Sequence, residues 1–232
     1  MTLGATLHAT SDLGERARAL VPFVDEHSSY CDRHGRVAEP VIDRLHEEGL
    51  FKMWVPRELG GAELDQVRSL EVLENLSYAD PSTGWVVMAA NLSIGTAGAY
   101  LADHAVGELF GDGKRPCIAG QGTRPGVAHQ VDGGLSLSGS WSFGSGLLHS
   151  NYVHSLGIIA ETGEPRIFVT PVEQATLQGN WDVMGLRGTG SIDYSMENVF
   201  VPDGWSHFAV TDQPLRGGDI FRNGIIGFAV IC

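Results

Sequence analysis

The spacing of hydrophobic residues changes once along this 232-residue chain, and the change limits the folds that it can adopt. From Ser11 to Phe110 apolar residues recur every three or four positions, which predicts amphipathic helices. After Lys114 the period becomes two, and glycine-rich turns separate short alternating segments, which predicts strands. The sequence therefore predicts an α+β fold, with a helical domain over residues 1–113 and a small antiparallel β-barrel domain over residues 114–212.

One predicted helix has no polar face. The stretch STGWVVMAANLSIGTAGAYL follows a helix-start signal at Asp80 and Pro81, and its residues are apolar or small on every side. Such a helix is expected at the centre of a bundle. Two polar residues on it, Asn91 and Ser93, therefore either bond a neighbouring backbone or face a substrate cavity.

Glycine-rich segments punctuate the predicted strands. The strongest hairpin signal is Asp132-Gly133-Gly134, which lies between two alternating runs. The segments GQGTRPG (120–126) and GLRGTG (185–190) are near misses for dinucleotide-binding loops, but neither begins a βαβ unit. We interpret both as turns.

Composition excludes several classes of function. The net charge is −13, and the thirteen arginines and two lysines are scattered singly, so no nucleic-acid partner is expected. The apolar stretches are too short to cross a bilayer and the first residues lack the pattern of a signal peptide, so we expect a cytoplasmic protein without a membrane partner. The three cysteines form no CxxC pair, which is typical of free thiols in a reducing compartment.

Residues 139–154, GSWSFGSGLLHSNYVH, combine aromatic, small, hydroxyl and histidine side chains. The FGSG stretch lacks the flanking glycines of a nucleophile elbow. His149 and His154 are five positions apart, which on one strand places them on opposite faces and argues against a joint metal site. An organic cofactor, flat enough to lie against this segment, is the expected source of chemistry.

Three segments in this order resemble the acyl-CoA dehydrogenase superfamily: LHEEGLFKMWVPRELGG (45–61), WSFGSG (141–146) and GLRGTGSIDYSMENVFVP (185–202). The run VDGGLSLSGSWSFGSG, the His149 that follows it and the GLRGTGS form are most similar to the two-component flavin-dependent monooxygenases of that superfamily. The resemblance implies reduced FAD or FMN delivered by a separate flavin reductase, a homotetramer, and hydroxylation or N-oxidation of a small aromatic or natural-product substrate.

The resemblance also assigns roles to residues. It implies a flavin ring against Trp141, Phe143, Ser145 and Gly146, a pyrimidine edge beside Gln121 and Thr123, and a supporting turn with Arg187, Thr189 and Ser191. Ser145 and His149 are the candidate catalytic residues, the first as a hydrogen-bonding hydroxyl at the reactive edge and the second as an acid or base. Asn91, Ser93 and Trp181 are candidate substrate contacts.

From the residues alone, each assignment keeps a structural alternative. The Ser145–Gly146 pair could simply turn the chain while the aromatics fill the barrel, His149 could be a hydrogen-bonded wall residue, and the GLRGTGS motif could be a structural turn.

In the superfamily a four-helix bundle follows the β domain, whereas here residues 213–232 correspond only to its start. We expect a fragment of a longer enzyme that binds flavin weakly by itself. The alternatives are one half of a split protein that another chain completes and a degenerate member of the superfamily. Two other functions remain open: an acyl-CoA dehydrogenase that oxidises a CH–CH bond of a thioester, and a non-catalytic scaffold that has lost flavin binding.

Overall fold

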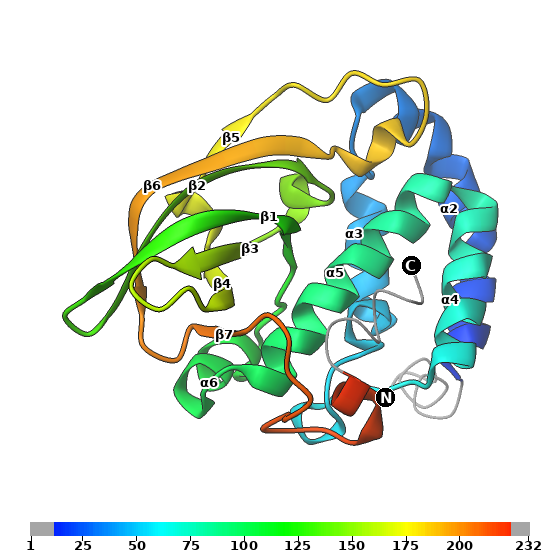
Figure 1. Cartoon of the computed structure of the whole chain (residues 1–232). Helices are drawn as coiled ribbons and strands as arrows, with labels where there is room; N and C mark the ends of the chain where they lie inside the picture. The colour runs from blue at the N-terminus through cyan, green and yellow to red at the C-terminus, as the bar shows by residue number, and fades with distance from the viewer. Residues whose placement is uncertain (1–11, 224–232) are drawn as a thin grey trace.

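The computed structural model describes residues 12–223, apart from the side chains of Thr123 and Asn223. Its helices precede its strands, as expected, and Figure 1 shows α5 lying between the other long helices and the sheet. The helices are α2 (Leu13–His34), α3 (Glu39–Glu47), α4 (Gln66–Ala79), α5 (Pro81–Tyr100) and α6 (Asp103–Phe110). Short 3-10 turns are η1 (Leu50–Lys52), η2 (Arg57–Leu59), η3 (Leu147–His149), η4 (Val172–Gln174), η5 (Arg187–Thr189) and η6 (Asp219–Asn223).

Helix α5 is the buried centre that its sequence predicts. Asp80 caps its first turn by accepting hydrogen bonds from the backbone N–H groups of Ser82 and Thr83, at 3.2 and 3.0 Å. Most of its residues are buried on all sides, against α4, η1, η5 and β1. At Gly95 an added Cβ would lie 2.7 Å from the carbonyl oxygen of Trp54, so the absence of a side chain permits this close packing.

Asn91 connects α5 to the segment that follows α3. Its side chain is fully buried, and its amide nitrogen donates to the carbonyl oxygens of Leu50 (2.8 Å) and Val87 (2.9 Å). Its amide oxygen accepts from the backbone N–H of Trp54 at 3.4 Å. Asn91 therefore bonds backbone, the first of the two roles predicted for it, and these hydrogen bonds lie inside the helical part.

The strands form one sheet of seven strands in the order β5-β6-β2-β1-β3-β4-β7. They are β1 (Ile118–Val131), β2 (Gly134–Gly144), β3 (Tyr152–Ile159), β4 (Pro165–Pro171), β5 (Thr176–Gln178), β6 (Ile192–Pro202) and β7 (Ser206–Phe208). The sheet curls, as Figure 1 shows, and Thr170 Oγ1 on β4 lies 3.7 Å from Met196 Sδ on β6.

The prediction of a purely antiparallel β domain is wrong, because β1 and β3 pair in parallel. The cause is the connection through η3. The β1–β2 hairpin returns the chain to the end of the sheet where β1 begins, and η3 then carries it across to the free side of β1. Strand β3 starts with Tyr152 beside Ile118, and must run in the same direction as β1.

Of the glycine-rich segments near β1, residues 132–134 form the predicted turn and residues 120–126 do not. Asp132 and Gly133 form the predicted two-residue turn between Val131 and Gly134. Residues 120–126, which we interpreted as a turn, instead lie within β1. The pairing of β1 with β3 shifts between Gln121 and Gly126, so the glycines serve a bulge in a continuous strand.

We predict that Asn91→Ala lowers the free energy of unfolding by about 2 kcal/mol, because it leaves the buried carbonyl of Leu50 without its partner. Urea unfolding followed by circular dichroism measures the loss. Asn75→Ala is the matched control, since Asn75 bonds the Glu71 carbonyl at an exposed position of α4. Equal stability of the two variants would contradict the role of Asn91.

Candidate active site

A cavity of about 240 Å³ lies where α5 meets the bulge of β1 and the turn after β2. The residues around it are uncharged at neutral pH, given the lowered pKa of His154 described below. They are Trp85, Met88, Ala89, Leu92, Ser93, Gly120, Gln121, Gly122, Phe143, Ser145 and His154. Of the residues predicted from sequence, the structure therefore brings Ser93, Gln121, Phe143 and Ser145 to one cavity.

The bulge of β1 is held by the hydroxyl of Tyr194 on β6. This hydroxyl accepts from the backbone N–H of Gln121 (3.1 Å), donates to the carbonyl of His154 (3.1 Å) and lies 2.9 Å from Ser155 Oγ. Burial raises the pKa of Tyr194, so the hydroxyl keeps its proton at neutral pH. The bulge is therefore a fixed wall of the cavity.

Close approach of two strands forms the same wall. A Cβ on Gly120 would lie 1.9 Å from the carbonyl oxygen of His154, so only glycine fits there. A Cβ on Gly122 would lie 3.8 Å from Nε2 of His154. At Gly120 and Gly122 the wall consists of backbone without side chains, a surface that a flat molecule could approach.

Trp141 supports this wall from inside the sheet. Its ring stacks on Tyr194 with centroids 5.2 Å apart, and its Nε1–H donates to the carbonyl of Leu156 at 3.0 Å. The side chain is buried and does not line the cavity. Strand alternation would place Trp141 and Phe143 on one face. The pairing of β2 with β6 shifts between Trp141 and Gly144, and Phe143 adopts φ 65°, so Trp141 is buried in the sheet whereas Phe143 is exposed at the cavity.

Phe143 lies at the mouth of the cavity. Its side chain is 64% exposed, and its backbone adopts φ 65°, a left-handed conformation uncommon for a bulky residue. The ring makes an edge contact with Trp181, with centroids 6.1 Å apart. Trp181 therefore lies beside the mouth, next to Phe143, and does not line the cavity wall.

Ser145 lies on the turn that follows β2. The next residue, Gly146, has φ 82°, and its N–H donates to the carbonyl of Thr189 at 2.9 Å, which fixes the turn. Ser145 Oγ accepts from Nε1–H of Trp85 at 3.0 Å and lies 2.7 Å from Ser191 Oγ. The hydroxyl is thus held between α5 and the start of β6.

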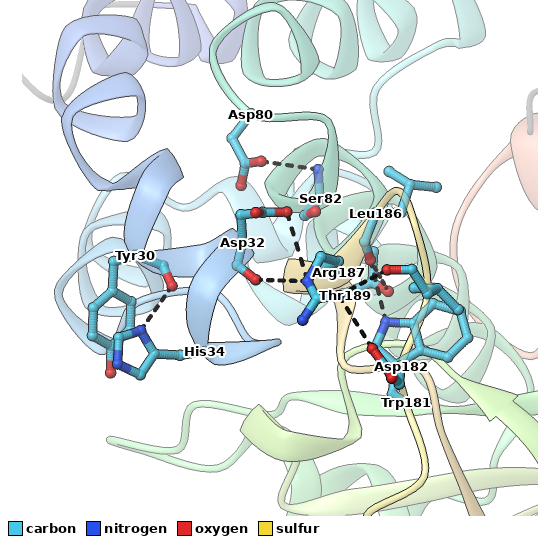
Figure 2. A network of polar contacts seen from close by, with 11 residues as sticks. Tyr30, Asp32, His34, Asp80, Ser82, Trp181, Asp182, Leu186, Arg187 and Thr189 are labelled. Atoms are coloured by element: carbon cyan, nitrogen blue, oxygen red, sulfur yellow. Dashed lines mark hydrogen bonds and ion pairs between the residues drawn. The ribbon is translucent and has the colours of Figure 1, made fainter.

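Arg187 ties the GLRGTGS turn to helix α2, as Figure 2 shows. Its Nε donates to the carbonyl oxygen of Asp32 at 3.0 Å, and Nη1 donates to the carbonyl of Val183 (2.9 Å) and to Asp182 (3.2 Å). Arg187 lies outside the cavity, whereas Thr189 and Ser191 are buried behind Ser145. Thr189 and Ser191 therefore contact the site through Ser145, and Arg187 supports their turn.

His149, the predicted acid or base, lies away from the cavity. Its side chain is 1% exposed, with Nδ1 3.5 Å from Nη2 of Arg36 and 3.6 Å from Oε1 of Glu39. Burial and the Arg36 charge lower its pKa to about 4. The histidine that lines the cavity is His154, whose buried Nδ1 has no hydrogen-bond partner among the described residues.

His154 is neutral at physiological pH. Burial lowers its pKa to about 3, with a further contribution from the nearby His207. Burial likewise lowers the pKa of His207 to about 4. His154 can therefore offer a neutral ring to the cavity but does not carry a charge there.

Sequence reasoning missed seven of the eleven cavity residues, among them Trp85 and His154. Trp85 is part of an apolar helix, and no local pattern connects it to a serine sixty positions later. His154 carried a signal, since a histidine in an apolar strand is expected to be buried with a polar partner, but its spacing from His149 only argued against a joint metal site.

The chain is similar to known proteins of one superfamily. A family model described as acyl-CoA dehydrogenase, N-terminal domain, matches residues 13–105. An indole-3-acetate monooxygenase of Pseudomonas putida is 33% identical over 85% of this chain and 51% of its own length. The oxygenase subunit HsaA, a flavin-dependent monooxygenase of Rhodococcus jostii, is 30% identical over 81% of this chain and 50% of its own. The chain belongs to the acyl-CoA dehydrogenase superfamily.

A solved structure extends the match to nearly the whole chain. XiaF from Streptomyces sp., in complex with FADH2 and glycerol, is 28% identical with a TM-score of 0.84, and the match covers 98% of this chain and 60% of XiaF. The superfamily assignment predicted from sequence is confirmed. The present chain spans about half the length of the curated relatives that it matches.

No helix among residues 12–223 is both long and apolar enough to cross a membrane.

We predict that Arg187→Ala speeds amide hydrogen exchange in residues 179–190, because the segment loses its bonds to Asp32 and Val183. Exchange measured by mass spectrometry should stay unchanged in β1 and β2. Arg68→Ala, which removes an exposed ion pair with Asp65, is the control and should leave both regions as they are. Slow exchange of 179–190 in Arg187→Ala would show that the loop is held by other contacts.

We also predict that acid destabilises the chain through His149, His154 and His207. Their folded pKa values lie below the ordinary 6.5, so the unfolded chain binds protons first as the pH falls. The free energy of unfolding is then highest above pH 6.5 and decreases toward pH 4, by up to about 1.4 kcal/mol per pH unit for each histidine.

Urea unfolding at a series of pH values measures this decrease. His154→Gln should flatten the pH dependence, whereas His34→Gln, at an exposed position, should not. A pH dependence that is the same in both variants would contradict the buried neutral state of His154.

Proposed function

We propose that the cavity beside Ser145 holds the ring of a reduced flavin and that the chain acts in a flavin-dependent monooxygenase. The observation that carries this proposal is the arrangement of one hydroxyl, Ser145, against a side-chain-free backbone wall at Gly120 and Gly122. The named relatives support it, since one is named as an indole-3-acetate monooxygenase and the other as the oxygenase subunit of a flavin-dependent monooxygenase. Reduced flavin, when bound, supplies the electrons that activate dioxygen for transfer of one oxygen atom to a substrate.

The residues present fit such a group. Gly120 and Gly122 allow a flat ring to approach the backbone, and the exposed Phe143 offers an apolar surface at the mouth. Ser145 supplies a fixed hydroxyl for the edge of the ring, and Gln121 lies on the same wall. Thr123 follows Gln121 along β1, and its predicted contact with the pyrimidine edge lies outside the described side chains.

The rest of the cavity favours a small, neutral aromatic substrate. Trp85, Met88 and Leu92 on α5 supply an apolar side that excludes water, and Ser93 and neutral His154 supply polar contacts that orient a ring. The relatives named as monooxygenases favour monooxygenation over acyl-CoA dehydrogenation.

The partners belong to the same proposal. Relatives named as oxygenase subunits or components imply a separate flavin reductase that supplies the reduced flavin. The proposal also includes a homo-oligomer and a cytoplasmic location, as the sequence predicts.

We predict that Ser145→Ala lowers the fraction of reduced flavin that is used for product by about tenfold, because the ring edge loses its hydrogen bond. The assay mixes the chain, reduced FAD or FMN, isotopically labelled dioxygen and indole or a simple phenol, and detects labelled product by mass spectrometry. Ser136→Ala, at the far end of β2, is the control.

The same assay distinguishes the functions. Labelled product in the wild type supports monooxygenation. Oxidation of an acyl thioester to its enoyl form, without oxygen incorporation, would favour the dehydrogenase. Absence of binding to both redox states of FAD and FMN would contradict a flavin site in this chain.

A further inference from the structure

A second cavity, of about 280 Å³, lies where the end of α3 and η1 meet the segment between α6 and β1. It shares no residue with the cavity beside Ser145, so it is a separate site. Two chain reversals contribute to it, and each contains a glycine with a left-handed backbone, Gly49 (φ 75°) and Gly113 (φ 74°). The residues around it are His46, Gly49, Phe51, Lys52, Gly113, Lys114, Arg115 and Pro116.

The charge of this cavity is opposite to that of the chain. The chain has a net charge of −13 and contains only two lysines, Lys52 and Lys114. Both line the cavity, together with Arg115, and none of the described residues around it is acidic. Three cations that gather at one concave surface of an acidic protein create a local positive potential, which attracts small anions.

These cations are not neutralised by strong ion pairs. Among residues 12–223 no carboxylate forms an ion pair with Lys52 or Lys114. Arg115 has a partner, Asp43, but the two charged groups are 3.7 Å apart and both side chains are more than half exposed, at 58% and 67%. Such an exposed pair is weak, so all three cations remain available to a ligand.

His46 responds to the positive charge around it. Its ring lies against the buried Phe51, with centroids 4.5 Å apart. Burial lowers the pKa of His46 to about 4, the charges of Arg115 and Lys52 lower it further, and Asp43 acts in the opposite direction. His46 is therefore neutral at pH 7. An anion bound in the cavity would offset the positive charges and raise this pKa.

We propose that this cavity binds a phosphate group through Lys52, Lys114 and Arg115. Each lysine ammonium group offers a compact charge with three donors, and the arginine adds a planar fork that matches two phosphate oxygens. A phosphate group fills only part of the cavity, so the ligand is inorganic phosphate or a small phosphomonoester. The site does not depend on flavin, because it has no residue in common with the cavity beside Ser145.

The first test titrates the chain with inorganic phosphate and with phenyl phosphate by calorimetry, at neutral pH and at equal ionic strength set by sodium chloride. We expect a single saturable site. Tighter binding of phenyl phosphate supports a phosphomonoester as the ligand, because the attached ring uses the remaining volume. Equal or tighter binding of inorganic phosphate supports the free ion. If neither ligand binds, the proposal is overturned.

Charge variants show whether these residues hold the phosphate. Lys52→Met and Lys114→Met should each weaken binding roughly three- to tenfold, because each removes an ammonium group and keeps an apolar stem. Asp43→Asn should strengthen binding, because it removes the carboxylate that competes for Arg115. Arg33→Met removes an exposed charge outside the cavity and should leave the affinity unchanged. No loss in the lysine variants, or an equal loss in Arg33→Met, would overturn the proposal.

Nuclear magnetic resonance observes the same site directly. Reductive methylation with an isotopic label keeps the charge of lysine, and the two lysines of the chain then give two side-chain signals, both from this cavity. Both signals should shift along one binding curve as phosphate is added, and the pKa of His46 should rise from about 4. Signals that respond equally to chloride, or an unchanged pKa of His46, would overturn the proposal.

Discussion

The arrangement depends on the burial of helix α5, whose one partly exposed stripe, Trp85, Ala89 and Leu92, lines the cavity. Because it packs against α4, η1 and η5 as well as β1, it fixes the helical part and the sheet relative to each other (Figure 1). Its first turns bring Trp85 to Ser145, and its middle turns bring Met88 and Leu92 over the β1 bulge.

The second constraint is that the wall opposite α5 consists of backbone without side chains at Gly120 and Gly122. Tyr194 holds the bulge of β1, Trp141 fills the space behind Tyr194, and Gly120 allows β3 to approach. The two aromatic residues of this region therefore have different roles. Trp141 supports the wall from inside the sheet, whereas Phe143 lies at the mouth of the cavity. Positive φ at Phe143, a cost that packing elsewhere offsets, is consistent with a functional position.

Sequence predicted the elements that depend on local pattern. The all-apolar helix, the Asp132-Gly133 hairpin and the change from helices to strands are confirmed because period and turn chemistry act over a few residues. The parallel pairing of β1 with β3 was missed because strand direction depends on where η3 carries the chain, which no local pattern encodes. The bulge at 120–126 was mistaken for a turn for the same reason.

The site was predicted in part, from motif rather than from geometry. Ser145 and Phe143 lie at the cavity, while His149 is held by Arg36 and Glu39 and its place at the cavity belongs to His154. Both residues are histidines in the same short segment, and only the path of the chain decides which of the two side chains faces the cavity. Trp85 could not be found from sequence, because its partner Ser145 is distant along the chain.

The central claim is that the cavity between α5 and the β1 bulge is a flavin site. A crystal structure of the chain soaked with reduced FMN under anaerobic conditions tests it most directly. The account predicts the ring against Gly120, Gly122 and Phe143, with N5 within hydrogen-bonding distance of Ser145 Oγ. Flavin bound elsewhere, for example in the polar cavity beside Arg166 and Ser206, with this cavity still empty, would contradict it.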